Sequence, residues 1–324
     1  MRKPFKTLFA VMALLGCVSA QTASAAYPDK PITLIVPFPP GGPTDVVARV
    51  ASSKAAELLG QQIVVENRAG AAGAIGASAI ARARPDGYTV GLATVSTHGT
   101  APHLYPELNY DPIKDFTPLT NLAGSPNILS VHPDFPAKTL KEFVELIKAN
   151  PGKYSYANAG AGGVNDLGMI WFLQEMGGEM VSVPYRGSAP ALTDTIGGTI
   201  PAIFDNYPSS MPHIQGGRLR ALAISSTERN AQLPELATFQ EQGYDGYNVT
   251  SWYGLVAPAG LPADVTQTLS KAFADAVNDP ATAAKLSEAG AFPIGNTNEA
   301  FSEQIAKELN LWRDVITKGD IKLQ

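Results

Sequence analysis

The sequence is poor in residues that build many catalytic, metal and nucleic-acid sites. It has one cysteine, Cys17, and four histidines in 324 residues. The histidines lack the spacing of metal-ligand motifs, and one cysteine cannot form a disulfide within the chain. Lys and Arg number 24 against 29 Asp and Glu, which gives a net charge of −5. Because nucleic-acid surfaces need clustered basic residues, this balance argues against a nucleic-acid partner.

Long hydrophobic runs are also missing. A membrane-spanning helix needs about 20 apolar residues, whereas the apolar run from Leu8 to Leu15 has eight. Basic residues precede this run, and small residues ending in Ala23-Ser24-Ala25-Ala26 follow it. This order predicts a secretory signal peptide over residues 1–25, cleaved after Ala25. We therefore expect a soluble mature protein in the periplasm.

Cys17 lies inside the predicted leader. The sequence Leu14-Leu15-Gly16-Cys17 resembles a lipoprotein cleavage box, so lipid attachment at Cys17 is the alternative to cleavage after Ala25. Cleavage after Ala25 would leave a mature chain without cysteine, and hence without a thiolate metal site or a cysteine nucleophile.

Hydrophobic residues make up 45% of the chain, enough for a full core. In the first half, strand-like runs at 32–36, 63–65 and 88–93 alternate with helical patterns at 46–59 and 74–83. This order predicts a parallel sheet covered by helices.

A second series begins near residue 129. It continues with predicted strands at 154–157, 181–184, 200–204 and 219–224, helices at 140–149 and 166–176, and a tail of three helices near 263–278, 280–289 and 298–317. We expect an α/β fold with two lobes: residues 26–127 plus 225–324 form the first lobe and residues 128–224 the second. Strands near 127–131 and 219–225 would cross between the lobes, with a ligand cleft where the strands end.

Two loops could hold an anion in this cleft. The first glycine loop, residues 38–44, connects a strand to a helix and contains Gly41 and Gly42. The second glycine loop, residues 158–165, repeats the strand–glycine–helix order. Glycines permit close backbone approach, and a helix N-terminus presents free N–H groups to an anion. An ordinary capped turn is the alternative for each loop alone, but two such loops facing one cleft predict a clamp.

Other polar residues follow predicted strands. Ser96 and Thr97 would supply hydroxyls at the same edge, and Asp205 would supply a carboxylate or form a turn. His98 is expected to be an ordinary loop histidine, and Arg186 to brace the lobe interface. The sequence has no Gly-x-Ser-x-Gly elbow, His-Glu-x-x-His helix or Walker loop, so no motif indicates an enzyme.

Several segments together resemble the Bug/TctC family, the extracytoplasmic solute receptors of tripartite tricarboxylate transporters. They are Pro37 to Asp45, Glu66-Asn67-Arg68, Arg84-Pro85-Asp86-Gly87-Tyr88-Thr89, Val183 to Pro190 and Leu219-Arg220-Ala221-Leu222-Ala223. The resemblance covers the whole expected mature chain.

The resemblance implies a type II periplasmic-binding fold that closes on a small carboxylate between the two glycine loops. The implied ligand-binding residues are Phe38, Pro40, Gly41, Gly42, Thr44, Ser96, Thr97, Asn158, Ala159, Gly160, Gly162, Gly163, Val164, Asn165 and Asp205. The sequence departs from the family at Gly163, where Ser is common, and at Asp166, where His is common. Asp166 could cap its helix, contact a ligand amine or hydroxyl, or repel a second carboxylate.

The resulting hypothesis is a receptor without cofactor, metal or catalytic residues. It would deliver an organic acid to the large and small membrane subunits of a tripartite tricarboxylate-type transporter, or report it to a sensor kinase. Two alternatives remain open at this point: an exported enzyme on the same fold that uses Asp205 or His98, and a receptor for an ATP-driven transporter.

Overall fold

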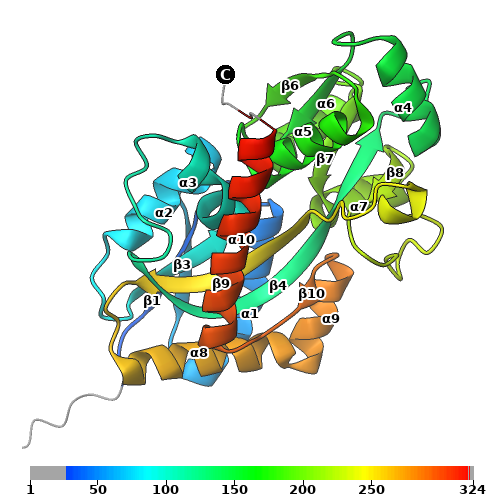
Figure 1. Cartoon of the computed structure of the whole chain (residues 1–324). Coiled ribbons are helices and arrows are strands. Elements are labelled where there is room, and N and C mark those ends of the chain that lie inside the picture. Colours follow the sequence, from blue (N-terminus) through cyan, green and yellow to red (C-terminus); the bar gives the residue numbers. More distant parts are fainter. Residues whose placement is uncertain (1–26, 320, 322–324) are drawn as a thin grey trace, which may run out of the picture.

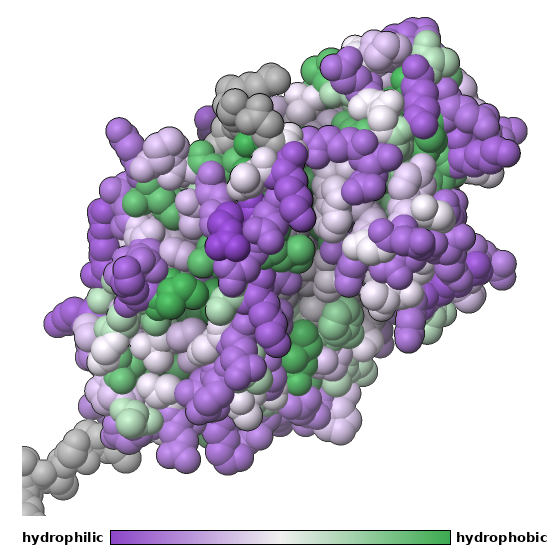
Figure 2. Space-filling view, in the orientation of Figure 1, coloured by the Kyte–Doolittle hydropathy of each residue, from purple (hydrophilic) through white to green (hydrophobic). Residues whose placement is uncertain are grey.

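The computed structural model describes residues 27–319 and residue 321, shown in Figure 1. The predicted signal peptide and Cys17 lie outside the described residues. None of the described helices is both long and apolar enough to span a bilayer. Hydrophilic residues dominate the face shown in Figure 2, and hydrophobic residues appear on it only in small separate groups.

Within residues 27–319, the strands form a ten-stranded sheet with the order β2-β1-β3-β9-β4-β7-β5-β6, and β8 and β10 both pair with β4. The strands are β1 (Ile32–Val36), β2 (Ile63–Asn67), β3 (Thr89–Thr94), β4 (Phe116–Val131), β5 (Ser155–Asn158), β6 (Val181–Pro184), β7 (Ala202–Asn206), β8 (Arg220–Ile224), β9 (Thr250–Pro258) and β10 (Phe292–Pro293).

Helices follow most of the parallel strands, as the alternation predicted. They are α1 (Pro43–Leu59), α2 (Ala74–Ala81), α3 (Ala101–Leu104), α4 (Leu140–Ala149), α5 (Val164–Met176), α6 (Ser188–Ile196), α7 (Tyr207–Gln215), α8 (Ala263–Asn278), α9 (Pro280–Glu288) and α10 (Asn298–Lys318). Short turns of other helical types are η1 (Ala71–Gly73), η2 (Val95–Thr100) and η3 (Gln240–Gln242).

Local sequence explains the ends of these elements. In α4, the Thr139 hydroxyl accepts a hydrogen bond from Glu142 N–H, which satisfies a free donor of the first turn. Leu140, Phe143 and Ile147 then form the buried stripe of the helix. The three predicted tail helices are confirmed as α8, α9 and α10, with ends that differ by no more than one residue.

The long strand β4 connects the two lobes. Residues 116–126 pair with β9, residues 127–131 pair with β7, and residues 128–131 also pair with β8. Figure 1 shows β4 and β9 running together from the first lobe toward the second.

The prediction that residues 219–225 form the other crossing strand is wrong. These residues form β8, which pairs with β4 only within the second lobe. The second long strand is β9, which pairs with β3 and β4 of the first lobe.

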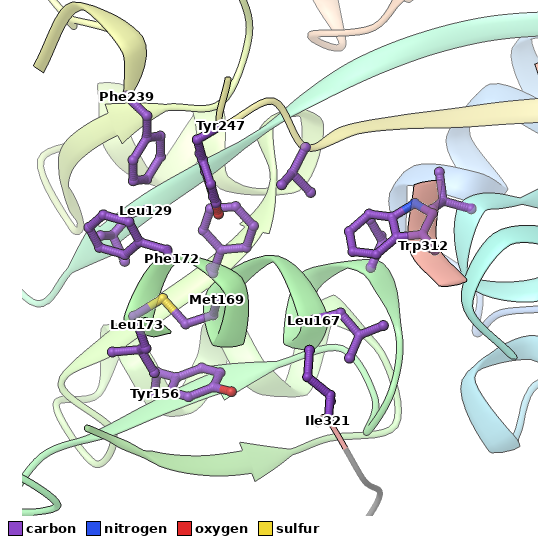
Figure 3. Packing of buried hydrophobic residues seen from close by; sticks show 14 of the residues in the cluster. Leu129, Tyr156, Leu167, Met169, Phe172, Leu173, Phe239, Tyr247, Trp312 and Ile321 are labelled. Carbon is purple, nitrogen blue, oxygen red and sulfur yellow. The ribbon is translucent and has the colours of Figure 1, made fainter. Parts of the chain in front are cut away.

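The segment between β8 and β9 packs with the second lobe. The Phe239 ring lies 4.9 Å from that of Phe172, and Tyr247 lies 5.8 Å from the same ring. Figure 3 shows Phe239 and Tyr247 beside Phe172 and Met169 of α5. We therefore propose that the boundary expected at residue 224 falls near residue 249 instead.

The C-terminal helix α10 crosses the front of the molecule in Figure 1 and packs on β4 and η2. Its Glu308 is partly buried, and Trp312 Nε1 donates a 3.0 Å hydrogen bond to the Glu308 carboxylate. Burial raises the Glu308 pKa from its ordinary value of 4.5 to about 7, although the Trp312 hydrogen bond acts in the opposite direction.

This pKa predicts a pH-dependent stability. Because the folded pKa exceeds the unfolded one, the folded state binds more protons between these values, and stability falls as the pH rises through about 7. Glu308→Gln should therefore stabilise the protein at pH 8.5, by up to about 3 kcal/mol, and change little at pH 4.5. Urea unfolding at both pH values measures the change in the free energy of unfolding. Glu303→Gln, at an exposed position of the same helix, is the control. A gain that is equal at both pH values would contradict the ionisation argument.

Candidate functional site

The two glycine loops have nearly the same backbone conformation. Gly41 has φ +80° and Gly162 has φ +70°, a region that favours glycine. The next residue caps the following helix in each case: Gly42 with φ −79° and ψ 169°, and Gly163 with φ −74° and ψ 167°. The sequence repeat is therefore also a structural repeat, one copy in each lobe.

An aspartate in the first turn of each helix holds the loop in place. Asp45 Oδ2 accepts a hydrogen bond from Gly41 N–H at 3.0 Å, and Asp166 Oδ2 accepts one from Gly162 N–H at 2.9 Å. Both bonds join residues four apart along the chain. The side chains of Asp45 and Asp166 therefore hold the two glycine loops in their conformations.

Asp45 carries a neutralising partner. Arg49 Nε and Asn67 Nδ2 each donate to its carboxylate at 2.9 Å. Burial alone would raise the Asp45 pKa, but the hydrogen bonds from Arg49, Gly41 and Asn67 outweigh it and lower the pKa. Asn67 also donates to Phe38 O at 3.0 Å, so one network fixes both ends of the first glycine loop.

Asp166 has four hydrogen-bond donors. Besides Gly162 N–H, they are the Tyr156 hydroxyl at 2.8 Å, Asn158 Nδ2 at 3.1 Å and the Ser182 hydroxyl at 2.7 Å. The side chain is buried among these groups, and Asp166 does not line the cleft cavity. Asp166 does not cap α5 as considered, since the N-cap is Gly163 without a side-chain cap hydrogen bond; instead its carboxylate supports the second glycine loop.

A cavity of about 40 Å³ lies between the loops. Its lining residues come from both lobes and from β9. They are Phe38, Pro39, Pro40, Gly42, Pro43, Thr44, Thr94, Val95, Ser96, Ala159, Val164, Asn165, Gly187, Ser188, Ala189, Asn206, Ser251, Trp252 and Tyr253.

More than half of the predicted site residues line this cavity. They are Phe38, Pro40, Gly42, Thr44, Ser96, Ala159, Val164 and Asn165. The others do not line it: Gly41, Thr97, Asn158, Gly160, Gly162, Gly163 and Asp205. Of these, Asn158 supports the second glycine loop, because Asn158 Oδ1 accepts from Gly160 N–H at 2.9 Å.

Asp205 supports the cavity wall instead of lining it. Its carboxylate accepts hydrogen bonds from the hydroxyls of Ser188 at 2.6 Å, Ser210 at 3.4 Å and Ser209. Burial raises the Asp205 pKa, while these hydrogen bonds act in the opposite direction. The expected direct role of Asp205 is therefore corrected: Ser188, which Asp205 orients, is the residue at the cavity.

Sequence reasoning also missed Asn206 and Ser251, which line the cavity. Asn206 Nδ2 donates to Ser251 Oγ at 2.5 Å and to Asn127 Oδ1 at 2.9 Å. Asn165 Nδ2 donates to the same Asn127 oxygen at 2.9 Å. Asn127 lies where β4 changes partners, so this network connects the binding loop to the crossing strand. The strand-end rule pointed to the end of β7 but selected Asp205 rather than its neighbour Asn206.

Thr97 and His98 belong to the support of the η2 turn. Thr97 Oγ1 lies 2.9 Å from His98 Nδ1, and the His98 ring packs against Phe116 with 4.5 Å between centroids. Burial lowers the His98 pKa to about 3, which keeps the imidazole neutral. Neither side chain lines the cavity.

The cavity offers neutral hydrogen-bond donors. Thr44 and Asn165 occupy equivalent positions in the first turns of α1 and α5, where backbone N–H groups have no intrahelical acceptor. Ser96 and Ser188 add hydroxyls, and the lining residues include no Lys or Arg. Two helix N-termini facing one cavity can hold an anion without a cationic side chain. Among the described residues, no group of three or more His, Cys, Asp or Glu is placed to hold a metal ion.

Comparison with known proteins identifies the family. The model of the tripartite tricarboxylate transporter family receptor matches residues 47–321. BugT of Bordetella pertussis is 34% identical over 308 residues, 95% of this chain and 94% of BugT.

Two solved structures share the two-lobed fold. A periplasmic transporter is 49% identical, with a TM-score of 0.90 over 92% of this chain and 100% of that chain. An R. palustris protein with adipate is 33% identical, with a TM-score of 0.89 over 91% of this chain and 99% of that chain. The chain therefore belongs to the tripartite tricarboxylate transporter receptor family, together with the Bug proteins.

Proposed function

We propose that this protein is a periplasmic receptor that captures a small organic carboxylate by closing its two lobes. The observation that carries this proposal is the pair of matched glycine loops, one in each lobe, whose helices α1 and α5 begin at one cavity. A ligand that bridges the two loops stabilises the closed arrangement, because it gains both sets of donors only there. The adipate bound by a relative supports a carboxylate as the bridging group.

The carboxylate would be held mainly by backbone N–H groups and hydroxyls. Thr44 N–H and Asn165 N–H would meet it from opposite lobes, and the Ser96 hydroxyl would add a donor. Ser96 Oγ already accepts a 3.0 Å hydrogen bond from Val164 N–H, so its own hydrogen is free to point toward the ligand. Neutral donors in a closed site bind an anion strongly, since little water is left to compete.

A receptor explains the site better than an enzyme does. The two groups considered for catalysis are Asp205 and His98. Both are buried away from the cavity and are engaged in supporting contacts. A general base must reach the proton it removes, and neither group does so in this arrangement.

Membership of this family also supports a proposal about the membrane partners of the protein. We propose delivery to the large and small membrane subunits of a tripartite tricarboxylate-type transporter, and export by the leader over residues 1–25. The alternative is delivery to an ATP-driven transporter. Reconstitution of the receptor with each set of membrane subunits would show which transporter takes up the ligand.

A thermal-shift screen tests the function. The protein is purified from the periplasm, its N-terminus is determined, and it is unfolded and refolded to remove bound ligand. We expect the N-terminus at Ala26 and a shift with one class among mono-, di- and tricarboxylates, amino acids, aromatic acids, sugars and cations. Ligand at 100 times its Kd should add about 2.7 kcal/mol. Shifts only with sugars or cations would overturn the carboxylate proposal.

A further inference from the structure

Besides the ligand site, the two lobes are joined by direct hydrogen bonds at the cleft. We propose that Thr100 and Tyr105 form a hydroxyl latch, which stabilises the closed arrangement and thereby sets ligand affinity without touching the ligand. Both are positioning residues. The part of this proposal that concerns affinity rests on the proposed receptor function, whereas the part that concerns lobe closure does not.

The latch consists of two hydroxyls from the first lobe and two consecutive carbonyls from the second. Thr100 Oγ1 donates to Gly162 O at 2.8 Å, and the Tyr105 hydroxyl donates to Ala161 O at 3.0 Å. Thr100 Oγ1 also lies 3.1 Å from Ser96 O, but its single hydrogen favours the shorter contact. Both acceptors belong to the second glycine loop, so the latch acts on the backbone that would hold the ligand.

The strained turn η1 of the first lobe lies close to the second glycine loop. Ala71 and Ala72 have φ of +46° and +47°, a conformation that costs non-glycine residues roughly 1–2 kcal/mol each. Ala72 lies so near that a methyl group added at Gly160 or Gly163 would come within 3.8 or 3.9 Å of the Ala72 Cβ. The turn η1 therefore lies close to the second glycine loop, on which the latch also acts.

The latch is separate from the ligand cavity. Neither Thr100 nor Tyr105 lines the cavity, and Thr100 is completely buried. Opening the lobes must break both hydrogen bonds and expose their groups to water. A hydrogen bond of this kind contributes a net factor of roughly 2 to 10 to an equilibrium. Because apparent affinity is proportional to the closed fraction, weakening the latch raises the Kd.

The chain offers matched controls for each latch residue. Tyr110 donates its hydroxyl to Thr97 O at 2.7 Å within the first lobe. Thr195 is as buried as Thr100 and donates to Ala191 O at 2.9 Å within α6. Tyr110→Phe and Thr195→Val therefore remove the same groups as Tyr105→Phe and Thr100→Val without affecting contacts between the lobes.

Single-molecule fluorescence transfer between the lobes tests the latch directly. A chain that begins at Ala26 contains no cysteine, so Ser53→Cys on α1 and Lys141→Cys on α4, both at exposed positions, provide two specific dye sites. Without added ligand, the double variant Thr100→Val/Tyr105→Phe should raise the ratio of open to closed molecules about tenfold or more. The Kd of the carboxylate with the largest thermal shift should rise several-fold, and the two control variants should stay within twofold of the parent.

The outcomes separate the latch from the receptor function. An unchanged distance distribution in a double variant with cooperative urea unfolding would overturn the latch, as would equal opening in the control variants. If no carboxylate binds the parent protein, the proposed function fails, but the ligand-free distance distribution still decides the latch.

Discussion

Replacing Asp166 with alanine should remove ligand binding and weaken the fold. The substitution leaves three buried donors, on Tyr156, Asn158 and Gly162, and the exposed Ser182 hydroxyl without their acceptor. Each buried unsatisfied group costs about 1–3 kcal/mol unless water replaces the carboxylate. We expect a loss of about 3–5 kcal/mol in the free energy of unfolding. Because Gly162 N–H is one of these donors, the second glycine loop should lose its conformation, and the Kd should rise at least about 100-fold, or about 2.7 kcal/mol.

Asp166→Asn separates the two effects. The amide keeps one acceptor oxygen but places an NH₂ group against a donor. We therefore expect the Kd to change more than the free energy of unfolding. Asp279→Ala is the control, since Asp279 also accepts backbone and side-chain hydrogen bonds at a helix start, those of Thr282, but lies outside the cavity. Urea unfolding and titration calorimetry measure both quantities. Native affinity in Asp166→Ala would show that the carboxylate does not position the loop.

Gly41→Ala should impair binding far more than it impairs stability. The residue has φ +80° and no atom lies within 4 Å of an added Cβ, so the cost comes from the backbone alone. A left-handed alanine costs about 1–2 kcal/mol, and the loop can relieve this strain by turning Gly41 away from Asp45. That movement would shift the first turn of α1, and we expect the Kd to rise at least about 30-fold.

Gly243→Ala provides a control with the same local cost. Gly243 has φ +92° and also has open space around an added Cβ, but it follows η3, outside the cavity lining. Both variants should lose similar stability in urea unfolding, and only Gly41→Ala should lose affinity by calorimetry. Equal affinities in the two variants would exclude a role for the first glycine loop in holding the ligand.

Much of the fold could be predicted from local sequence. The β-branched run 32–36 and the apolar run 88–93 become β1 and β3. β4 was recognised only in its last part, because Gly124 and Pro126 interrupt the pattern of a strand that pairs with β9 on one side and β10 on the other. The long strand β9 was not predicted, because its pairing with β3 and β4 depends on partners far away in sequence, which leave no local signal.

The same distinction applies to the site. The glycine loops were predictable because a loop and the helix that follows it are one local unit. Local sequence does not show which of two adjacent residues at the end of a strand faces the cavity. The prediction named Asp205, whereas its neighbour Asn206 lines the cavity. Ser251 reaches the cavity through the pairing of β9 with β4, and Asp166 finds its donors on β5, the loop and Ser182 of β6. These contacts are set by tertiary packing.

The most direct test of the central claim is a crystal structure with the carboxylate that gives the largest thermal shift. The account predicts one carboxylate group between the first turns of α1 and α5, with its oxygens about 2.7–3.2 Å from Thr44 N–H and Asn165 N–H. A carboxylate bound by one lobe only, or a ligand whose uncharged end lies between the loops, would contradict the clamp.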